Sequence, residues 1–250
     1  MDGTIYVSNR LLPKARNFID MLRKQSFPFV FLTNNSASRS EDYRKKLSRL
    51  GIDVERERIL TSGEATTRFL LMETSHRKVC LLGTPSLEQE FRESGFELEN
   101  ENPDCVVLGF DMTVTYEKLS NAALLLAKGI PYYATHPDFT CITDKGLIPD
   151  TGALIAALDT VVHRKPKIIG KPYPEMVTAA LERLGSTAGE TAIVGDQMDT
   201  DLTMAASSGL YSILVLSGET SLEKLESQKK IQPDMVVQNI GELYDIMSRL

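Results

Sequence analysis

The chain has no tryptophan, and it has only three histidines and three cysteines among its 250 residues. Cys80, Cys105 and Cys141 are odd in number and include no Cys-x-x-Cys pair, which argues against a disulfide framework and against a zinc site of cysteine and histidine. Cys80 and Cys105 lie inside apolar runs that are typical of strands. We therefore expect buried, reduced thiols.

Long apolar runs and an excess of positive charge are also missing. No apolar run approaches the ~20 residues that a membrane span needs. The segment Met1–Thr4 lacks the basic and apolar stretches of a signal peptide. Lysine and arginine total 28 against 34 acidic residues, so the net charge is −6. A chain of this charge has no excess of positive residues that would attract nucleic acid or anionic membranes. We expect a cytoplasmic protein that binds neither, and any phosphate site in it needs a local cation.

An ordinary globular composition remains, with 42% hydrophobic and 25% charged residues, and helical and strand patterns alternate along the chain. Helices are predicted at residues 14–25, 38–50, 64–73, 86–94, 116–128, 151–162, 173–184, 200–208 and 240–248. Strands are predicted at residues 29–32, 78–83, 105–109, 131–135, 167–169, 191–195, 211–216 and 234–237. Strands separated by helices indicate an α/β fold with a parallel sheet.

Two polar stretches, residues 73–78 and 163–166, have the composition of linkers. If both are boundaries, residues 78–165 form an α/β unit inserted into a core made of residues 1–77 and 166–250. One continuous sheet is the alternative, and composition does not decide between the two.

Polar residues follow several predicted strands, which is where parallel α/β sheets bind ligands. The segment Asp2-Gly3-Thr4 alone usually marks a turn. The apolar run before Thr33 ends in Thr33-Asn34-Asn35-Ser36, whose hydroxyl and backbone N–H groups suit phosphate oxygens. Plain helix capping explains this second segment equally well.

Two further junctions lie in the last third of the chain. The strand at 167–169 is followed by Gly170 and Lys171, where glycine lets the backbone approach a ligand and lysine supplies a point charge. Alone, a surface lysine is the commoner interpretation. The strand at 191–195 is followed by three carboxylates within six residues, Asp196, Asp199 and Asp201. Their oxygens suit a hard cation such as Mg²⁺, whereas an acidic helix N-terminus is the simpler alternative.

Four short motifs occur in order along the chain: an acid, Thr-Asn, Lys-Pro and Gly-Asp-x-x-x-Thr-Asp. Taken together, they resemble the four motifs of the haloacid dehalogenase (HAD) superfamily of phosphohydrolases. The length between Thr33 and Lys171 is similar to that of the branch with a large α/β cap inserted there. Further details resemble the NagD-like, 4-nitrophenylphosphatase-type branch. The segments that carry this resemblance are Asp2–Tyr6, Leu32–Ser36, Leu82–Pro85, Val107–Asp111, Gly170–Pro172 and Gly195–Asp201. It covers essentially the whole chain and implies a Rossmann-like parallel-sheet core with an inserted α/β cap domain.

The resemblance implies an aspartyl-phosphate mechanism. Asp2 matches the second aspartate of the first motif, which protonates the leaving group and then activates water. Thr33 and the Asn34 backbone match the groups that hold phosphoryl oxygens. Lys171 matches the lysine that offsets the negative charge of carboxylates and phosphate.

The resemblance also implies a Mg²⁺ site. Asp196 matches a direct ligand, Asp201 lies nearby in support, and the main-chain carbonyl of Asp2 is a further ligand. In this family the metal and the lysine together clamp the charge on the transferring group.

One departure from the family pattern, Asp-x-Asp-Gly-Thr, concerns the nucleophile. With Asp2 as the second aspartate, the nucleophile falls one position before Met1, and the first strand of the sheet precedes it. Either the start of this sequence was placed at an internal methionine, or the chain is a truncated, inactive form. We favour the misplaced start, because loss of a central strand leaves backbone groups of both neighbours without partners.

The sequence thus predicts a Mg²⁺-dependent phosphatase of small phosphorylated metabolites, such as nucleotide, sugar or aryl phosphate monoesters. A catalytically inactive HAD-like protein that binds a phosphometabolite is the alternative. A homodimer is left open. In the expected cap, His136-Pro137-Asp138 resembles an Asn-Pro-Asp turn of the branch; it would contact the leaving group if it faces the site, although an ordinary turn is the simpler interpretation.

Overall fold

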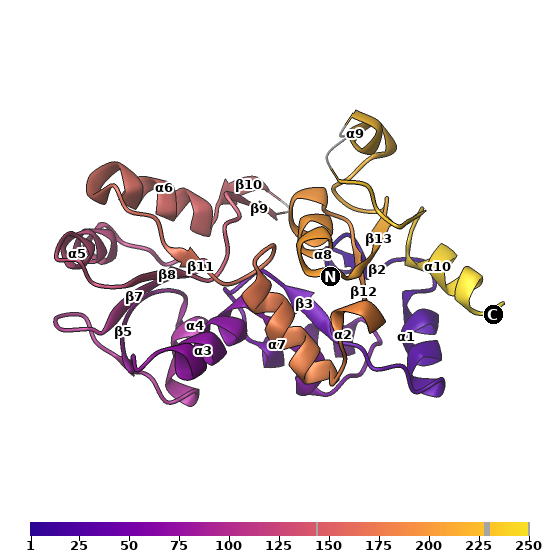
Figure 1. The fold of residues 1–250 in the computed structure, drawn as a ribbon, viewed down its shortest axis with the longest axis horizontal. Helices are drawn as coiled ribbons and strands as arrows, with labels where there is room; N and C mark the ends of the chain where they lie inside the picture. Colours follow the sequence, from indigo (N-terminus) through magenta and orange to yellow (C-terminus); the bar gives the residue numbers. More distant parts are fainter. Residues whose placement is uncertain (144, 228–230, 250) are drawn as a thin grey trace. The chain divides into compact units, whose positions relative to one another are not determined.

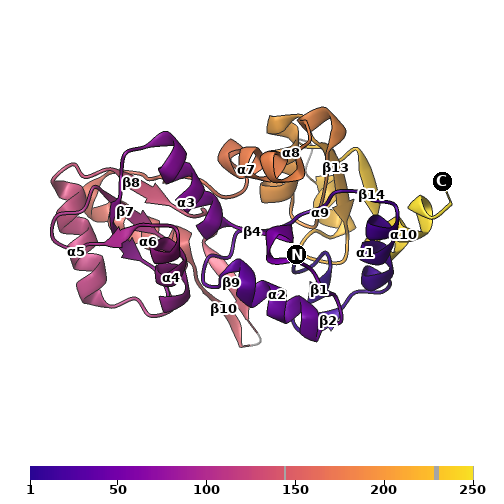
Figure 2. The same ribbon diagram turned by 90° about the horizontal axis from the view of Figure 1, so that it is seen from below.

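The computed structural model describes residues 1–143, 145–227 and 231–249, and they divide into two compact units. Unit 1 consists of Met1–Leu32, Arg44–Ile59 and Val177–Leu250. Unit 2 consists of Thr33–Tyr43 and Leu60–Met176. Figure 1 and Figure 2 show the elements of each unit from two directions.

Unit 2 contains a five-stranded sheet in the order β11-β8-β7-β5-β6, in which all neighbours run parallel. Its strands are β5 (Lys78–Leu82), β6 (Glu97–Leu98), β7 (Cys105–Leu108), β8 (Tyr132–Ala134) and β11 (Lys167–Ile168). Its helices are α3 (Ser62–Glu73), α4 (Pro85–Glu93), α5 (Tyr116–Ala127) and α6 (Thr151–Val162). The helices α4, α5 and α6 lie between strands in the chain, as parallel pairing requires.

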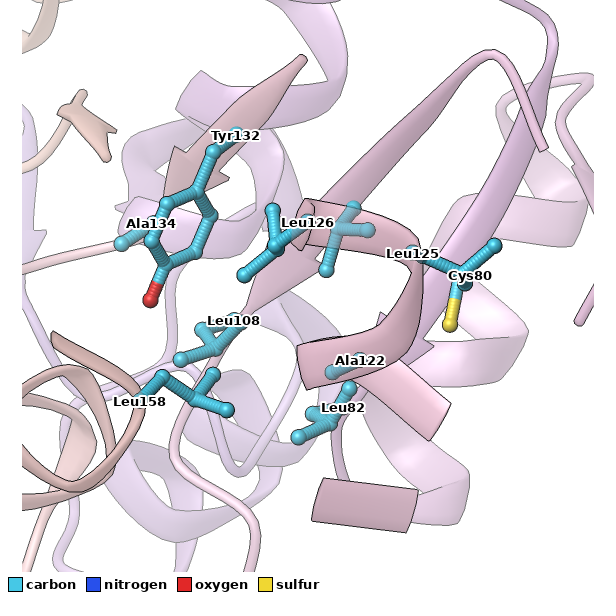
Figure 3. Packing of buried hydrophobic residues seen from close by; sticks show 10 residues of the cluster. Cys80, Leu82, Leu108, Ala122, Leu125, Leu126, Tyr132, Ala134 and Leu158 are labelled. Carbon is cyan, nitrogen blue, oxygen red and sulfur yellow. The ribbon is translucent and has the colours of Figure 1, made fainter. Parts of the chain in front are cut away.

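The side chains of β5 show how this sheet is covered on both faces. Cys80 and Leu82 pack in one buried cluster with α5 and α6, which Figure 3 shows from close by. Val79 and Leu81 pack in a second cluster with α3 and α4. Successive strand residues point to opposite faces, so a continuous apolar run is what a strand between two helical layers needs.

Polar side chains fix where the helices of unit 2 begin. Thr61, Thr84 and Thr115 each accept a hydrogen bond from a backbone N–H in the first turn of α3, α4 and α5. Asp150 accepts one from the N–H of Thr151 at the start of α6. These bonds satisfy N–H groups that have no partner within the helix.

An antiparallel pair, β9 (Thr140–Thr143) and β10 (Gly146–Pro149), interrupts the parallel pattern of unit 2. Ile142 lies opposite Leu147, and both side chains are exposed. The sequence does not predict these strands, because Thr140–Thr143 and Gly146–Pro149 show no strict alternation of polar and apolar residues.

Unit 1 contains a parallel sheet in the order β12-β13-β14 and an antiparallel pair, β1 with β2. Its strands are β1 (Tyr6–Val7), β2 (Arg10–Leu11), β12 (Ala192–Gly195), β13 (Tyr211–Val215) and β14 (Met235–Val237). Its helical segments are α1 (Ala15–Lys24), η1 (Arg56–Arg58), η2 (Ala188–Glu190), η3 (Met198–Leu202), α8 (Thr203–Ser208), α9 (Leu222–Ser227) and α10 (Ile240–Met247). The amphipathic α1 buries Ala15, Phe18 and Ile19 and packs against α10.

Four elements contain the points where the chain passes from one unit to the other. They are β3 (Phe31–Thr33), α2 (Ser40–Arg49), β4 (Ile59–Thr61) and α7 (Pro174–Leu184). The strands β3 and β4 pair in a sheet of two. The second sequence motif begins at the end of β3, and the third comes shortly before α7.

The α/β class and the parallel sheets are confirmed. The predicted helix at 200–208 was wrong in its first part, where η3 is a wider π-helical turn and α8 begins only at Thr203. The expected inserted unit, 78–165, falls within unit 2, while its boundaries stay a prediction. In the described parts of the chain, every helix falls short of the length and hydrophobicity that a bilayer span requires.

The three thiols are expected to differ sharply in reactivity. Burial raises the pKa of the Cys80 thiol to about 11 and that of Cys105 to about 12, whereas Cys141 is partly exposed. Since the thiolate is the nucleophile, a thiol reagent at pH 8 should modify one cysteine of the native protein, Cys141. Mass spectrometry of the labelled peptides checks this. Rapid labelling of Cys80 or Cys105 would contradict it, and denaturant should expose all three.

Candidate functional site

The segment Asp2-Gly3-Thr4 forms a tight turn at the start of unit 1. The carbonyl of Met1 accepts hydrogen bonds from the N–H groups of Thr4 (3.2 Å) and Ile5 (2.8 Å). Gly3 has a φ of +74°, a conformation that glycine adopts without steric cost. The carboxylate of Asp2 is exposed at this turn, so it is open to a reacting group.

Asp196 comes directly after β12 and packs against that turn. Its side chain is only 6% exposed. The hydroxyl of Thr4 donates to its Oδ1 at 3.1 Å, and the N–H of Glu219 donates to its Oδ2 at 2.9 Å. The first and last sequence motifs, 192 residues apart, therefore meet at one buried carboxylate.

Two glycines make room for this carboxylate. A Cβ atom at Gly3 would lie 2.3 Å from Oδ2 of Asp196, and one at Gly218 would lie 2.0 Å from it. Both distances are far below a van der Waals contact. Any side chain at these positions would therefore push Asp196 out of its place.

The other two carboxylates of the run have different surroundings. Asp201 is buried and packs against Gly195, where a Cβ would lie 2.3 Å from its Oδ2. Asp199 is exposed. The π-helical turn η3 carries both residues, and turns of this kind occur frequently at functional sites.

The donor set of unit 1 fits a hard cation such as Mg²⁺. Asp196 and Asp201 are buried carboxylates that follow the same strand, and carboxylate oxygens are ligands that Mg²⁺ accepts. Among the described residues there is no group of three or more histidine, cysteine, aspartate or glutamate side chains around one point. Mg²⁺ needs no such group, because it takes one or two carboxylates and keeps several waters.

A lysine that the sequence analysis missed lies close to Asp2. The Lys46 ammonium, on α2, is 4.1 Å from the centroid of the Tyr6 ring, and Tyr6 forms a bridge with Asp2. Burial lowers the pKa of Lys46, while the Asp2 carboxylate opposes that shift. Lys46 lies within the helix predicted at 38–50, but no motif of the sequence includes it.

In unit 2, Asn34 and Lys171 are joined by two hydrogen bonds. The side-chain amide of Asn34 accepts from the N–H of Lys171 (2.8 Å) and donates to its carbonyl (2.9 Å). Asn34 is 7% and Lys171 8% exposed. A Cβ at Gly170 would lie 2.8 Å from Oδ1 of Asn34, so glycine is needed for this approach.

Thr33 and Asn35 flank Asn34 in the sequence. Thr33 is half-buried, and its hydroxyl accepts a hydrogen bond from the N–H of Asn35. The side chain of Asn35 accepts one from the N–H of Ala37 at 2.9 Å, as in an Asx turn. Helix capping was the competing interpretation of this segment, and Asn35 does bind backbone locally, whereas Asn34 binds Lys171.

Comparison with known proteins decides the family. A model described as haloacid dehalogenase-like hydrolase matches residues 1–97, and one described as HAD-hydrolase-like matches residues 168–243. An acid sugar phosphatase from Staphylococcus aureus is 34% identical over 97% of this chain and 93% of its own length. The chain belongs to the HAD-like hydrolases.

Solved structures place this HAD hydrolase in the NagD-like branch. A 4-nitrophenylphosphatase from Thermotoga maritima superposes with a TM-score of 0.95 and 43% identity, covering 98% of this chain and 94% of the other. NagD from Escherichia coli K-12 superposes with a TM-score of 0.91 and 32% identity, covering 97% and 95%. The chain is accordingly an HAD-type hydrolase of phosphoric monoesters.

The predicted site residues of the HAD hydrolase form two groups. In unit 1 the turn after Asp2 binds Asp196, and Asp201 follows on the same strand-to-helix segment. In unit 2 Asn34 binds Lys171, and Thr33 precedes it. The catalytic, substrate and metal roles of these residues stay predictions.

Proposed function

We propose that the chain is a Mg²⁺-dependent phosphatase of small phosphorylated metabolites that works through an aspartyl-phosphate. The observation that carries the proposal is the contact of Thr4 with Asp196, since it joins the acid–base turn to a buried carboxylate. The relatives named acid sugar phosphatase and 4-nitrophenylphosphatase support sugar and aryl phosphate monoesters as substrates. Nucleoside monophosphates are the third class that we propose to test.

In this proposal, Thr33, Asn34 and Lys171 hold the phosphoryl group. The Thr33 hydroxyl and the Asn34 N–H donate to its oxygens, and the Lys171 ammonium offsets its charge. Lys171 supplies the local cation that an acidic chain needs for an anionic substrate. Residues 78–165, as the proposed cap, would contribute the contacts to the leaving group.

Asp2 has the proposed role of general acid and base. An aspartate nucleophile forms a bond to phosphorus while the ester P–O bond breaks, and the carboxyl of Asp2 gives its proton to the leaving oxygen. Asp2, now ionised, takes a proton from water as that water attacks the aspartyl-phosphate. Inorganic phosphate leaves, and both carboxyl groups return to their starting states.

The family pattern sets the proposed nucleophile two positions before Asp2, outside the 250-residue sequence. The described strand partners support an additional strand there. Within the described residues, β12 pairs only with β13, and β3 pairs only with β4. Each therefore keeps an open edge of backbone N–H and C=O groups, which a strand before Met1 would be able to pair.

Asp196, Asp201 and the main-chain carbonyl of Asp2 would hold the metal ion. When bound, the ion would supply positive charge toward the phosphoryl oxygens. The chain's own part is to keep the carboxylate of Asp196 fixed between Gly3 and Gly218, with Thr4 and Glu219 bound to it. A ligand held in this way needs no rearrangement before the metal binds.

Turnover of 4-nitrophenyl phosphate with and without Mg²⁺ tests the proposal, on the 250-residue chain and on a form extended by a strand that ends in aspartate. We expect Mg²⁺-dependent hydrolysis from the extended form. Binding of inorganic phosphate without turnover by either form would instead support the inactive, phosphometabolite-binding alternative.

Removal of the Lys171 ammonium is expected to weaken the binding of phosphate analogues. A hydrogen bond to a charged group contributes roughly 1.5–3 kcal/mol, so Lys171→Ala should lower the affinity for vanadate by about ten- to a hundredfold. Titration calorimetry in the presence of Mg²⁺ measures this. The matched control is Lys165→Ala, which removes an exposed lysine of the same unit and should change nothing. Equal affinity in Lys171→Ala would make Lys171 an ordinary lysine.

A further inference from the structure

The side-chain amide of Asn34 uses both kinds of hydrogen-bonding group. Its oxygen accepts from the N–H of Lys171, and its nitrogen donates to the carbonyl of Lys171. The second N–H of the nitrogen points at Asp138, whose two carboxylate oxygens lie 3.3 and 3.2 Å away. The amide is therefore enclosed by Lys171 on one side and by Asp138 on the other.

Asp138 favours the same orientation of this amide as the main chain of Lys171 does. If the amide were reversed, its oxygen would face both the carboxylate of Asp138 and the carbonyl of Lys171. All three groups are hydrogen-bond acceptors, so no proton would lie between them. An ionised carboxylate has no donor to offer. The N–H and the carbonyl of Lys171 already select this orientation, and the carboxylate of Asp138 reinforces it.

Buried polar groups hold Asp138 in place. Its carbonyl accepts a hydrogen bond from the N–H of Gly152 at 2.8 Å. Two residues earlier, the His136 ring is completely buried, and its Nδ1 and Nε2 lie 2.9 Å from the Thr135 hydroxyl and from Asp150 Oδ1. The turn was singled out in the sequence as His136-Pro137-Asp138, and its backbone is fixed on both sides of Asp138.

We propose that Asp138 is a positioning residue for phosphate binding: its carboxylate orients the Asn34 amide, and that amide fixes the main chain of Lys171. The inference rests on the proposed function, because it assigns Asp138 to the group of residues proposed to bind phosphate. Asp138 acts through Asn34 and needs no contact with the substrate.

Removal of the charge of Asp138 distinguishes two possible roles, because they predict opposite changes in phosphate affinity. If Asp138 only adds negative charge near Lys171, then Asp138→Asn should bind phosphate more tightly. If it positions the amide, then Asp138→Asn should bind more weakly, because a neutral acceptor holds an N–H less strongly than a carboxylate does. Hydrogen bonds to charged groups are about twice as strong as neutral ones. We expect the less firmly held amide to lower phosphate affinity by about five- to tenfold, less than the loss of a direct contact to the anion.

Stability separates positioning from a merely structural role. Burial raises the pKa of Asp138, with Asp150 adding to the shift and His136, Asn34 and Lys171 opposing it. An aspartate whose folded pKa is raised loses stability as the pH rises from its unfolded pKa through its folded pKa, since the folded state disfavours the charge. At pH 7.5 the Asn variant escapes this cost, so its melting temperature should be equal to or above that of the wild type.

The experiment is a double-mutant cycle on the 250-residue chain, with inorganic phosphate and Mg²⁺ in the calorimeter. The variants are Asp138→Asn, Lys171→Ala and the pair. The matched control is Asp104→Asn, which removes a carboxylate that accepts from the N–H groups of Arg77 and Lys78 elsewhere in unit 2. If Asp138 acts through Lys171, Asp138→Asn should change phosphate affinity less than about twofold in the Lys171→Ala background. Asp104→Asn should leave affinity unchanged.

Each outcome decides one of the two proposals. Affinity equal to or above wild type in Asp138→Asn, or the same loss in both backgrounds, overturns the positioning role and leaves the proposed function standing. A wild type that binds no phosphate overturns the proposed function, and the positioning role with it. Should Asp138→Asn not fold, Asp138→Glu keeps the charge but moves it by one methylene, and undiminished phosphate affinity in that variant would equally overturn the positioning role.

Discussion

Asp196→Asn is expected to lose most of the stabilisation that Mg²⁺ gives the protein. A ligand that binds only the folded state at a hundred times its Kd adds about 2.7 kcal/mol. For a chain of this length, each kcal/mol raises the melting temperature by roughly 2–4 °C. We therefore expect a Mg²⁺-dependent shift of roughly 5–10 °C in the wild type and little shift in the variant. A thermal melt at several Mg²⁺ concentrations measures it.

The chain supplies a matched control for this substitution. Asp199 is in the same acidic run, three residues after Asp196, but its side chain is exposed. Asp199→Asn removes the same charge from the same segment and should keep the full Mg²⁺ shift. An unchanged shift in Asp196→Asn, or an equal loss in Asp199→Asn, would show that the run attracts Mg²⁺ only by its overall charge.

The predictable part of the fold is the part whose side chains repeat with a regular period. The apolar run of β5 indicates a strand covered on both faces, and its residues do alternate between the two helical layers of unit 2. In the helix predicted at 14–25, Ala15, Phe18 and Ile19 are apolar at helical spacing, and they form the buried face of α1. Each of these signals lies within about ten residues of sequence.

Elements without such a period could not be predicted. Ile142 and Leu147 face solvent in the β9–β10 pair, so burial imposes no alternation there. The wide turn η3 carries acidic residues that also suit the first turn of an α-helix, and the segment was accordingly predicted as α-helical. In both places the local sequence fits more than one backbone conformation, and contacts with the rest of the unit select one.

Contacts in the site between residues far apart in the sequence could not be predicted either. Motif spacing drew attention to Asn34 and Lys171 separately, but the two hydrogen bonds between them join residues 137 positions apart. The amide of Asn34 was not predicted to act at all, since the motif implied only its backbone N–H. Its partner Asp138 was noticed in sequence as part of a turn, and only the folded chain shows which side chain that turn presents to Asn34.

An added strand before Met1 is expected to have the largest effect of all. A form extended by about five apolar residues, the usual strand length, and ending in aspartate supplies the proposed nucleophile. It should hydrolyse 4-nitrophenyl phosphate in a Mg²⁺-dependent reaction, and the 250-residue chain should be no faster than its Lys171→Ala variant. The added strand should also raise the melting temperature, because it gives ladder partners to β12, which pairs on one side only within the described part of the chain.

Two variants of the extended form separate chemistry from folding. With asparagine in place of the added aspartate, the gain in melting temperature should remain while turnover is lost, because the strand pairs but no carboxylate attacks phosphorus. Asp2→Asn in the extended form should lose roughly a hundred- to ten-thousandfold in rate, the usual contribution of a general acid and base. Robust Mg²⁺-dependent turnover by the purified 250-residue chain would contradict the assignment. In that case Asp2, the exposed carboxylate of the Asp-Gly-Thr turn, would itself be the first candidate for the nucleophile.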